Sequence, residues 1–312
     1  MEIRILVAIG NTGLDESTVD YLSNLFKGRD DVRFDLLTVV QIEGVTESQR
    51  LLGDITSVAL SHPVALKKKT AATNHLSLLR SKFQKNGFSE EQVDYQAVFS
   101  YSGIADTLLQ KGQSGTYDAI VLAKRDISGL QKMLLGSISA TLWQKDHSVP
   151  LWIISGKPVK RHFLVPVDCS LHTLDAVDHL AFILQGDKEA EIFLFHAASM
   201  LGDGNIAPKE DFYEKWGREW CEQHLKGDGD GHYHFHATEQ ILKEGQIPGS
   251  HIHRINVEAG VEPAQMIVKA MKSHSYWTIV MGRRLAREKN IFKGVSDRVL
   301  ANINNSTLWV VG

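Results

Sequence analysis

The chain has 312 residues, 43% hydrophobic and 23% charged, and its 34 basic and 37 acidic side chains give a formal net charge of −3. This balance lacks the excess of one sign that a nucleic-acid-binding face requires, and no apolar run approaches the ~18–20 residues of a membrane span. Its two cysteines, without a CxxC pair, argue against a disulfide framework or a cysteine zinc site, so we predict a cytoplasmic globular protein of about two domains.

The first half of the chain alternates predicted strands and helices. Val19, Leu22 and Phe26 recur at helical spacing, so they mark one face of a helix. Asp15 is predicted to cap the start of that helix, and a second, longer helix begins near Ala65. The predicted strands lie near 3–9, 33–40, 93–99, 118–123 and 150–155.

The second half repeats this order. Val177, Leu180 and Leu184 match the helical positions of the first half, with Thr173 as the predicted cap. The predicted strands lie near 161–167, 190–196, 251–257, 276–281 and 307–311. Gly and Pro at 156–158 end the first repeat, which predicts domains over 1–156 and 160–312.

A shift of about 158 residues aligns the two halves. Residues 117–123 match 276–282, and the pair Leu151-Trp152 matches Leu308-Trp309. Two unrelated α/β proteins would share the alternation of strands and helices by chance. They would rarely also share a Leu-Trp pair and a Gly at nearly the same spacing, so we infer a duplication. Alternating strands and helices predict an α/β fold of two tandem, doubly wound, Rossmann-like units with helices on both faces of a parallel sheet.

Ligands of open α/β sheets bind beyond the carboxyl ends of the strands. In the second half Gly282 ends the fourth strand, and a glycine there lets a sugar or phosphate approach the backbone. Two arginines, Arg283 and Arg284, follow it and offer forked donors to anionic oxygens. Further on, Gly294 and Ser296 open a helix, where N–H groups, a hydroxyl and the helix dipole favour phosphate.

At these residues the chain resembles the universal stress protein family, whose nucleotide-binding members carry Gly-x2-Gly-x9-Gly-Ser/Thr. The resemblance covers each half once. It implies a five-stranded, adenine nucleotide alpha hydrolase-like fold, with ATP, ADP or AMP as the ligand. It also implies pairing of the terminal strands (150–155 and 307–311) in an internal pseudo-dimer, and a possible homodimer. The implied nucleotide-binding residues are Asp168, Ser170, Ala197, Gly282, Arg283, Arg284, Gly294, Val295 and Ser296.

The motif is altered in both halves. In the second, Leu285 replaces a glycine, the gap is eight residues, and Val295 precedes the serine. In the first, Gly10, Ala123 and Asp126 stand at the positions of the Asp and the first two glycines, although Gly136-Ser137 is intact. Because the Asp126 carboxylate repels phosphate by ~1 kcal/mol or more at short range, we predict that only the second half binds nucleotide. Tight turns or helix–sheet packing remain an alternative role for the glycines.

Eleven of the fourteen histidines lie in the second half. If the segment around them is extended, His232, His234 and His236 share one face and present three imidazoles, a set that suits zinc. A solvated loop is the default interpretation of this Gly/Asp-rich segment, so no metal site is predicted.

No motif places a nucleophile or general base, so we expect at most slow ATP hydrolysis. We therefore predict a stress-response regulatory protein that binds an adenine nucleotide in its second half and acts through an unknown protein partner. The alternatives are an interaction protein with a non-nucleotide ligand, and a weak ATPase or zinc-binding protein.

Overall fold

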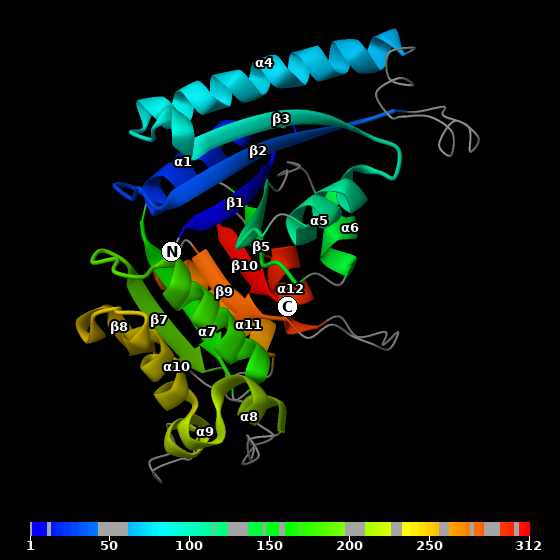
Figure 1. Cartoon of the computed structure of the whole chain (residues 1–312). Coiled ribbons are helices and arrows are strands. Elements are labelled where there is room, and N and C mark those ends of the chain that lie inside the picture. Colours follow the sequence, from blue (N-terminus) through cyan, green and yellow to red (C-terminus); the bar gives the residue numbers. More distant parts are fainter. Residues whose placement is uncertain are drawn as a thin grey trace. The chain divides into compact units, whose positions relative to one another are not determined.

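The computed structural model describes most of the chain, and it divides into two compact units, Met1–Lys157 and Pro158–Gly312 (Figure 1). Each unit is considered by itself. The described residues are 2–10, 14–42, 62–114, 116–123, 137–145, 148–155, 160–168, 170–196, 210–225, 233–255, 262–274, 278–283, 294–302 and 306–312.

The first unit contains a parallel sheet with the strand order β3-β2-β1-β4-β5. The central strand β1 is buried along most of its length because Ile5, Leu6 and Val7 are all inaccessible to solvent. Apolar runs of this kind are typical of parallel strands that are covered on both faces. The strands are β1 (Ile3–Ala8), β2 (Val32–Gln41), β3 (Val93–Ser100), β4 (Ala119–Ala123) and β5 (Leu151–Ile154).

Helices cover both faces of this sheet (Figure 1). Helix α1 packs against α4, which lies along β2 and β3, whereas α5 packs against α6. Phe34 on β2 is stacked on Phe83 of α4, with ring centroids 4.6 Å apart, so an aromatic contact joins helix and sheet. The helices are α1 (Asp15–Leu25), α4 (Pro63–Lys85), α5 (Ile104–Ser114) and α6 (Ser137–Gln144), with a 3₁₀ turn η1 (Glu90–Gln92) before β3.

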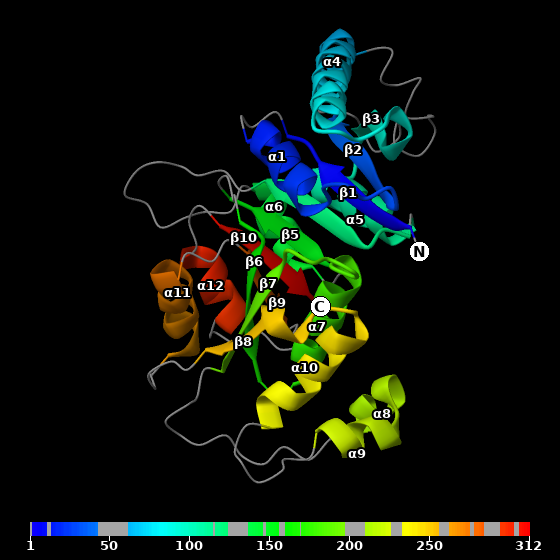
Figure 2. The same ribbon diagram turned by 90° about the vertical axis from the view of Figure 1, so that its left-hand side faces the viewer.

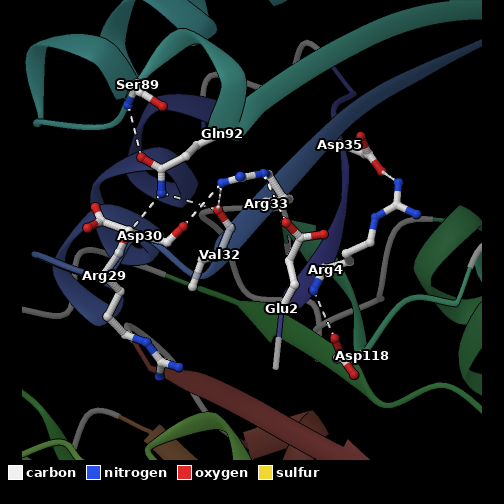
Figure 3. A network of polar contacts seen from close by, with 10 residues as sticks. All are labelled: Glu2, Arg4, Arg29, Asp30, Val32, Arg33, Asp35, Ser89, Gln92 and Asp118. Carbon is white, nitrogen blue, oxygen red and sulfur yellow. Dashed lines mark hydrogen bonds and ion pairs between the residues drawn. The ribbon is translucent and has the colours of Figure 1, made fainter.

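Polar side chains tie the strands together at their amino ends (Figure 3). Arg4 on β1 donates from Nη2 to Asp35 of β2 and from its backbone N–H to Asp118 just before β4, both at 2.8 Å. Gln92 of η1 donates from Nε2 to the carbonyl oxygen of Val32 at 3.2 Å. This network lies at the end of the sheet opposite the carboxyl ends, so we assign it to stability.

The second unit has the corresponding strand order, β10-β9-β6-β7-β8, and all of its strand pairs are parallel. Its strands are β6 (His162–Val167), β7 (Glu191–His196), β8 (Ile252–Ile255), β9 (Thr278–Gly282) and β10 (Thr307–Val311). Trp309 on β10 is fully buried and contacts Phe163 on β6 edge-to-face, with centroids 5.5 Å apart.

Helices α7 and α10 lie on one face of this sheet, and α11 and α12 lie on the other (Figure 2). Two short helices, α8 and α9, precede α10 and have no counterpart among the described residues of the first unit. The helices are α7 (Leu171–Ile183), α8 (Glu210–Trp216), α9 (Arg218–His224), α10 (Tyr233–Glu244), α11 (Pro263–His274) and α12 (Val295–Asn302), with a 3₁₀ turn η2 (Gly249–His251) before β8.

The two sheets share a register as well as an order. Arg4 pairs with Arg33 in the first unit, and His162 pairs with Glu191 in the second, each about 158 positions further on. A common register is expected of a duplication, because a shift of one residue would turn every side chain to the other face of the sheet.

The α/β prediction is confirmed, and each observed strand begins or ends within about two residues of its expected bounds. The predicted helix caps are wrong. Leu14, not Asp15, precedes α1, and the buried Asp15 carboxylate is 2.9 Å from Nε2 of His75. Ser170, not Thr173, caps α7. No helix of the described residues is long and apolar enough to cross a membrane.

Candidate functional site at the strand-order switch of the second unit

The chain changes direction across the second sheet between β6 and β9. From β6 the chain continues outward to β7 and β8, and it returns to the other side of β6 to form β9 and β10. Such a switch point is where open α/β sheets bind ligands. Asp168 directly follows β6 and Arg283 directly follows β9, so the predicted residues 168, 170, 282 and 283 border the same switch point.

The strand ladder at the switch is shorter in the second unit than in the first. In the first, β1 and β4 pair over four residues, up to Ala8 with Leu122. Among the described residues of the second, β6 and β9 pair only through Phe163 and Leu164, so the hydrogen-bonded ladder ends earlier. Pro166 stands where the first unit has Ala8 and has no N–H to donate, which explains the shorter ladder.

Asp168 is exposed, and its carboxylate is held in place by the start of α7. Its Oδ1 accepts hydrogen bonds from the backbone N–H of Ser170 at 2.9 Å and from Oγ1 of Thr173 at 2.6 Å. Ser170 also donates to Asp168 from its hydroxyl, while its own Oγ accepts from the N–H of Thr173 as the helix cap. The predicted residues Asp168 and Ser170 therefore form one rigid turn.

A side chain bridges the ends of the first two strands in both units. Nδ1 of His196, the last residue of β7, donates to the carbonyl oxygen of Val167 at 2.9 Å. At the equivalent place in the first unit, Oγ1 of Thr38 donates to the carbonyl oxygen of Ile9 at 3.0 Å. The duplication has kept this contact with a different donor, so we assign His196 to the frame of the site.

Gly282 packs against a helix instead of leaving space for a ligand where its side chain would be. A Cβ at this position would lie 2.1 Å from the carbonyl oxygen of His172, in the first turn of α7. Real Cβ atoms essentially never come so close to backbone, so only glycine allows α7 to lie over the end of β9. The helix–sheet packing alternative is thus the one that the geometry supports for Gly282.

At the start of α12, the chain's own carboxylate occupies the backbone donor of Gly294. The Gly294 N–H donates to Oδ2 of Asp297 at 2.9 Å. Ser296 is only 7% exposed, whereas Val295 is 40% exposed. The helix therefore presents an apolar side chain where the related motif has a hydroxyl.

Arg283 is a buried cation beside this helix. It is 9% exposed, and its backbone N–H donates to the carbonyl oxygen of Val311 on β10 at 2.8 Å. Burial lowers the pKa of its guanidinium, and the nearby Asp297 carboxylate opposes part of that shift. The guanidinium remains charged because an arginine keeps its proton far above neutral pH, so it partly neutralises Asp297.

Several predicted residues fall elsewhere. Ala197, Arg284 and His232 lie outside the described residues, as do Asp126 and Gly136 of the first half. The extended histidine face is wrong, because His234 and His236 belong to helix α10, where residues two apart do not share a face. Among the described side chains, no three His, Cys, Asp or Glu residues are grouped so as to hold a metal ion.

The sequence interpretation gave no role to Asp297 or His172. An aspartate three residues after a glycine helix cap is a capping signal, so Asp297 could have been found from sequence. The contact of His172 with Gly282 joins residues far apart in the chain, and no local signal predicts it.

A separate hollow of about 620 Å³ lies between α11 and α12. Its rim carries Lys269, Lys272 and Arg298, and Arg298 forms an ion pair with Glu262 at 2.7 Å. Asp168 and Gly282 are not among its lining residues, so it is distinct from the switch point.

Comparison with known protein families identifies the second unit. The model of the universal stress protein family matches residues 160–311. The second unit belongs to this family. The match covers nearly the whole second unit, and the first unit has the same strand order and register as this universal stress protein domain.

Solved structures resemble the chain over nearly its whole length. A universal stress protein from Archaeoglobus fulgidus DSM 4304 covers 98% of this chain and 97% of its own, with 16% identity and a TM-score of 0.64. A functionally unknown protein from Pseudomonas aeruginosa PAO1 covers 99% and 92%, with 14% identity and a TM-score of 0.58. These likenesses establish the tandem universal stress protein fold.

A structure of one universal stress protein in complex with cAMP matches 49% of this chain and 96% of its own, with 12% identity and a TM-score of 0.32. Comparison of the sequence with curated proteins yields no match.

Proposed function

We propose that this universal stress protein is a regulatory protein whose second unit binds an adenine nucleotide or nucleoside at the switch between β6 and β9. The bound state would be read by a protein partner. The supporting observation is the Asp168 carboxylate, which is exposed and fixed by Ser170 and Thr173 at the mouth of this switch. A fixed carboxylate is suited to accept hydrogen bonds from ribose hydroxyls, since it loses little entropy on binding.

The first unit lacks this feature. Gly10 follows β1 where Asp168 follows β6, and β1 remains paired with β4 along most of its length. We therefore expect one binding site per chain, in the second unit. No described residue is placed as a nucleophile or general base by these contacts, so the proposal is binding and not catalysis.

The test is isothermal titration calorimetry of the full chain with AMP, compared with the Asp168→Asn variant. Asparagine keeps an oxygen that can accept the N–H of Ser170. It removes the negative charge that strengthens hydrogen bonds from ribose hydroxyls. We expect one site per chain and a loss of affinity on the order of tenfold or more, the worth of a charged hydrogen bond.

The control is Asp94→Asn on β3, which changes the net charge equally in the first unit and should leave the titration unchanged. Binding of AMP with equal affinity by Asp168→Asn would disprove the assignment of this site. An absence of heat with AMP, adenosine and ATP alike would favour the second candidate, an interaction protein without a nucleotide. The carboxylate of Asp297 at the expected phosphate position is the observation that favours that candidate.

A further inference from the structure

Carboxylates of the chain occupy the positive ends of both helices that begin at the switch point. Asp297 accepts the N–H of Gly294 at the start of α12, and Asp168 accepts the N–H of Ser170 at the start of α7. Helix amino termini attract anions through unpaired N–H groups and the helix dipole. Here one N–H of each helix start already donates to an aspartate that lies at the positive end of the dipole, so a phosphate would have to displace that carboxylate or lie beside it.

The formal charge of the described residues at this place is unfavourable to a polyphosphate. Two carboxylates, Asp168 and Asp297, stand against one cation, Arg283. Arg283 is 9% exposed and its charge acts on Asp297, so it is poorly placed to receive several anionic oxygens. Each close pair of like charges weakens binding about fivefold even in water, and more where water is partly excluded.

The outer surface of the first turn of α12 points to the same conclusion. Val295 is 40% exposed, and the hydroxyl-bearing Ser296 is 7% exposed. A Cβ added to Gly294 would meet Oδ2 of Asp297 at 3.3 Å, so the carboxylate lies directly against this glycine. The residues that the structure describes at this site therefore do not fit the phosphates of ATP, although the Asp168 turn fits a ribose.

From these contacts we infer that the second unit selects an adenine nucleoside, or at most its monophosphate, over ATP. Asp297 is the residue that sets this preference, because it holds the phosphate position with a negative charge. The inference rests on the proposed function and names the ligand class of that same site.

The first experiment measures the affinity of the full chain for adenosine, AMP and ATP by calorimetry, with and without Mg²⁺. We expect adenosine and AMP to bind, and ATP to bind more weakly by on the order of tenfold under both conditions, the result of one or two repulsive pairs. ATP binding as tightly as adenosine, with or without Mg²⁺, would overturn the inference.

The second experiment repeats the titrations on Asp297→Asn. The amide oxygen still accepts the N–H of Gly294, so the start of α12 is preserved while the charge is removed. We expect affinity for ATP to rise about tenfold, with adenosine affinity within twofold of the wild type. Asp94→Asn in the first unit is the matched charge control and should change neither ligand.

These outcomes separate the two proposals. If adenosine binds but Asp297→Asn leaves ATP affinity unchanged, the role of Asp297 is wrong while the proposed function stands. If no adenine compound binds to the wild type or to Asp297→Asn, the proposed function itself fails.

Discussion

The glycine at the end of β9 shows how one residue type serves two purposes that sequence does not separate. A glycine beyond a strand suits both a nearby ligand and a nearby helix. At Gly282 the missing side chain is replaced by the backbone of His172, 2.1 Å from where a Cβ would stand. At Gly294 the neighbour is instead the flexible end of Asp297, at 3.3 Å. The two glycines of the motif therefore differ in what they permit.

Gly282→Ala should destabilise the second unit. The added methyl meets backbone that cannot rotate away, and overpacking of this kind costs about 1–3 kcal/mol or more. The measurement is the free energy of unfolding in urea, with Gly249→Ala as the control. Gly249 has open space around its Cβ position, so its substitution should stay within about 0.5 kcal/mol of the wild type. Equal stability of the two variants would contradict the packing role.

Helix α7 carries the switch point at one end and a half-buried histidine further along. The ring of His179 lies 6.0 Å from that of Trp309 on β10 in an edge-to-face contact. Burial lowers the pKa of His179 to about 3, so it is neutral in the folded protein near neutral pH. The packing of α7 on the sheet thus depends on an imidazole that is difficult to protonate.

Acid should weaken this packing. The unfolded chain protonates His179 near pH 6.5, whereas the folded chain does so only near pH 3, so the unfolded state binds more protons between these values. Stability attributable to His179 is full above pH 6.5 and falls by ~1.4 kcal/mol per pH unit below it. Between pH 7.5 and pH 5 the wild type should therefore lose about 2 kcal/mol more than His179→Phe.

Urea unfolding of both proteins at the two pH values measures this difference. Phenylalanine keeps an aromatic ring against Trp309 and removes the titrating group. The quantity compared is the change in unfolding free energy between the two pH values, so a difference in absolute stability between the two proteins does not affect it. The same loss of stability in both proteins would assign the acid sensitivity to other groups.

At the scale of the whole molecule, the two units share one architecture but differ at the carboxyl end of their first strand. Both have the same strand order, register and link between the first two strand ends. Only the second has a carboxylate after its first strand and a shortened ladder beside it. After the duplication the two units kept the same sheet scaffold but differ at the edge where the carboxyl ends of their strands lie. This is expected where core packing is retained and site residues diverge.

Ligand protection should accordingly be confined to one unit. With adenosine at saturation, hydrogen exchange should slow in residues 162–168, 170–183, 278–283 and 294–302, because binding stabilises the state that forms the site. Residues 3–10, 14–25, 119–123 and 137–144 of the first unit should exchange at unchanged rates. Equal protection of both units would show that the first also binds, and would contradict the role given to Asp168.

The sequence alone determined the repeat, the strand and helix order and the α/β class, because these follow from hydrophobic periodicity and from an offset that recurs along the chain. Through the family resemblance it also named Asp168 and Ser170 as site residues, and the structure places both in one turn because their contact is local. Only the tertiary structure decided what faces Gly282, how far β6 and β9 stay paired, and which charge lies at the start of α12. Those features depend on contacts between residues distant in the chain. Hydrophobic periodicity does not predict which distant backbone segment packs against a given residue.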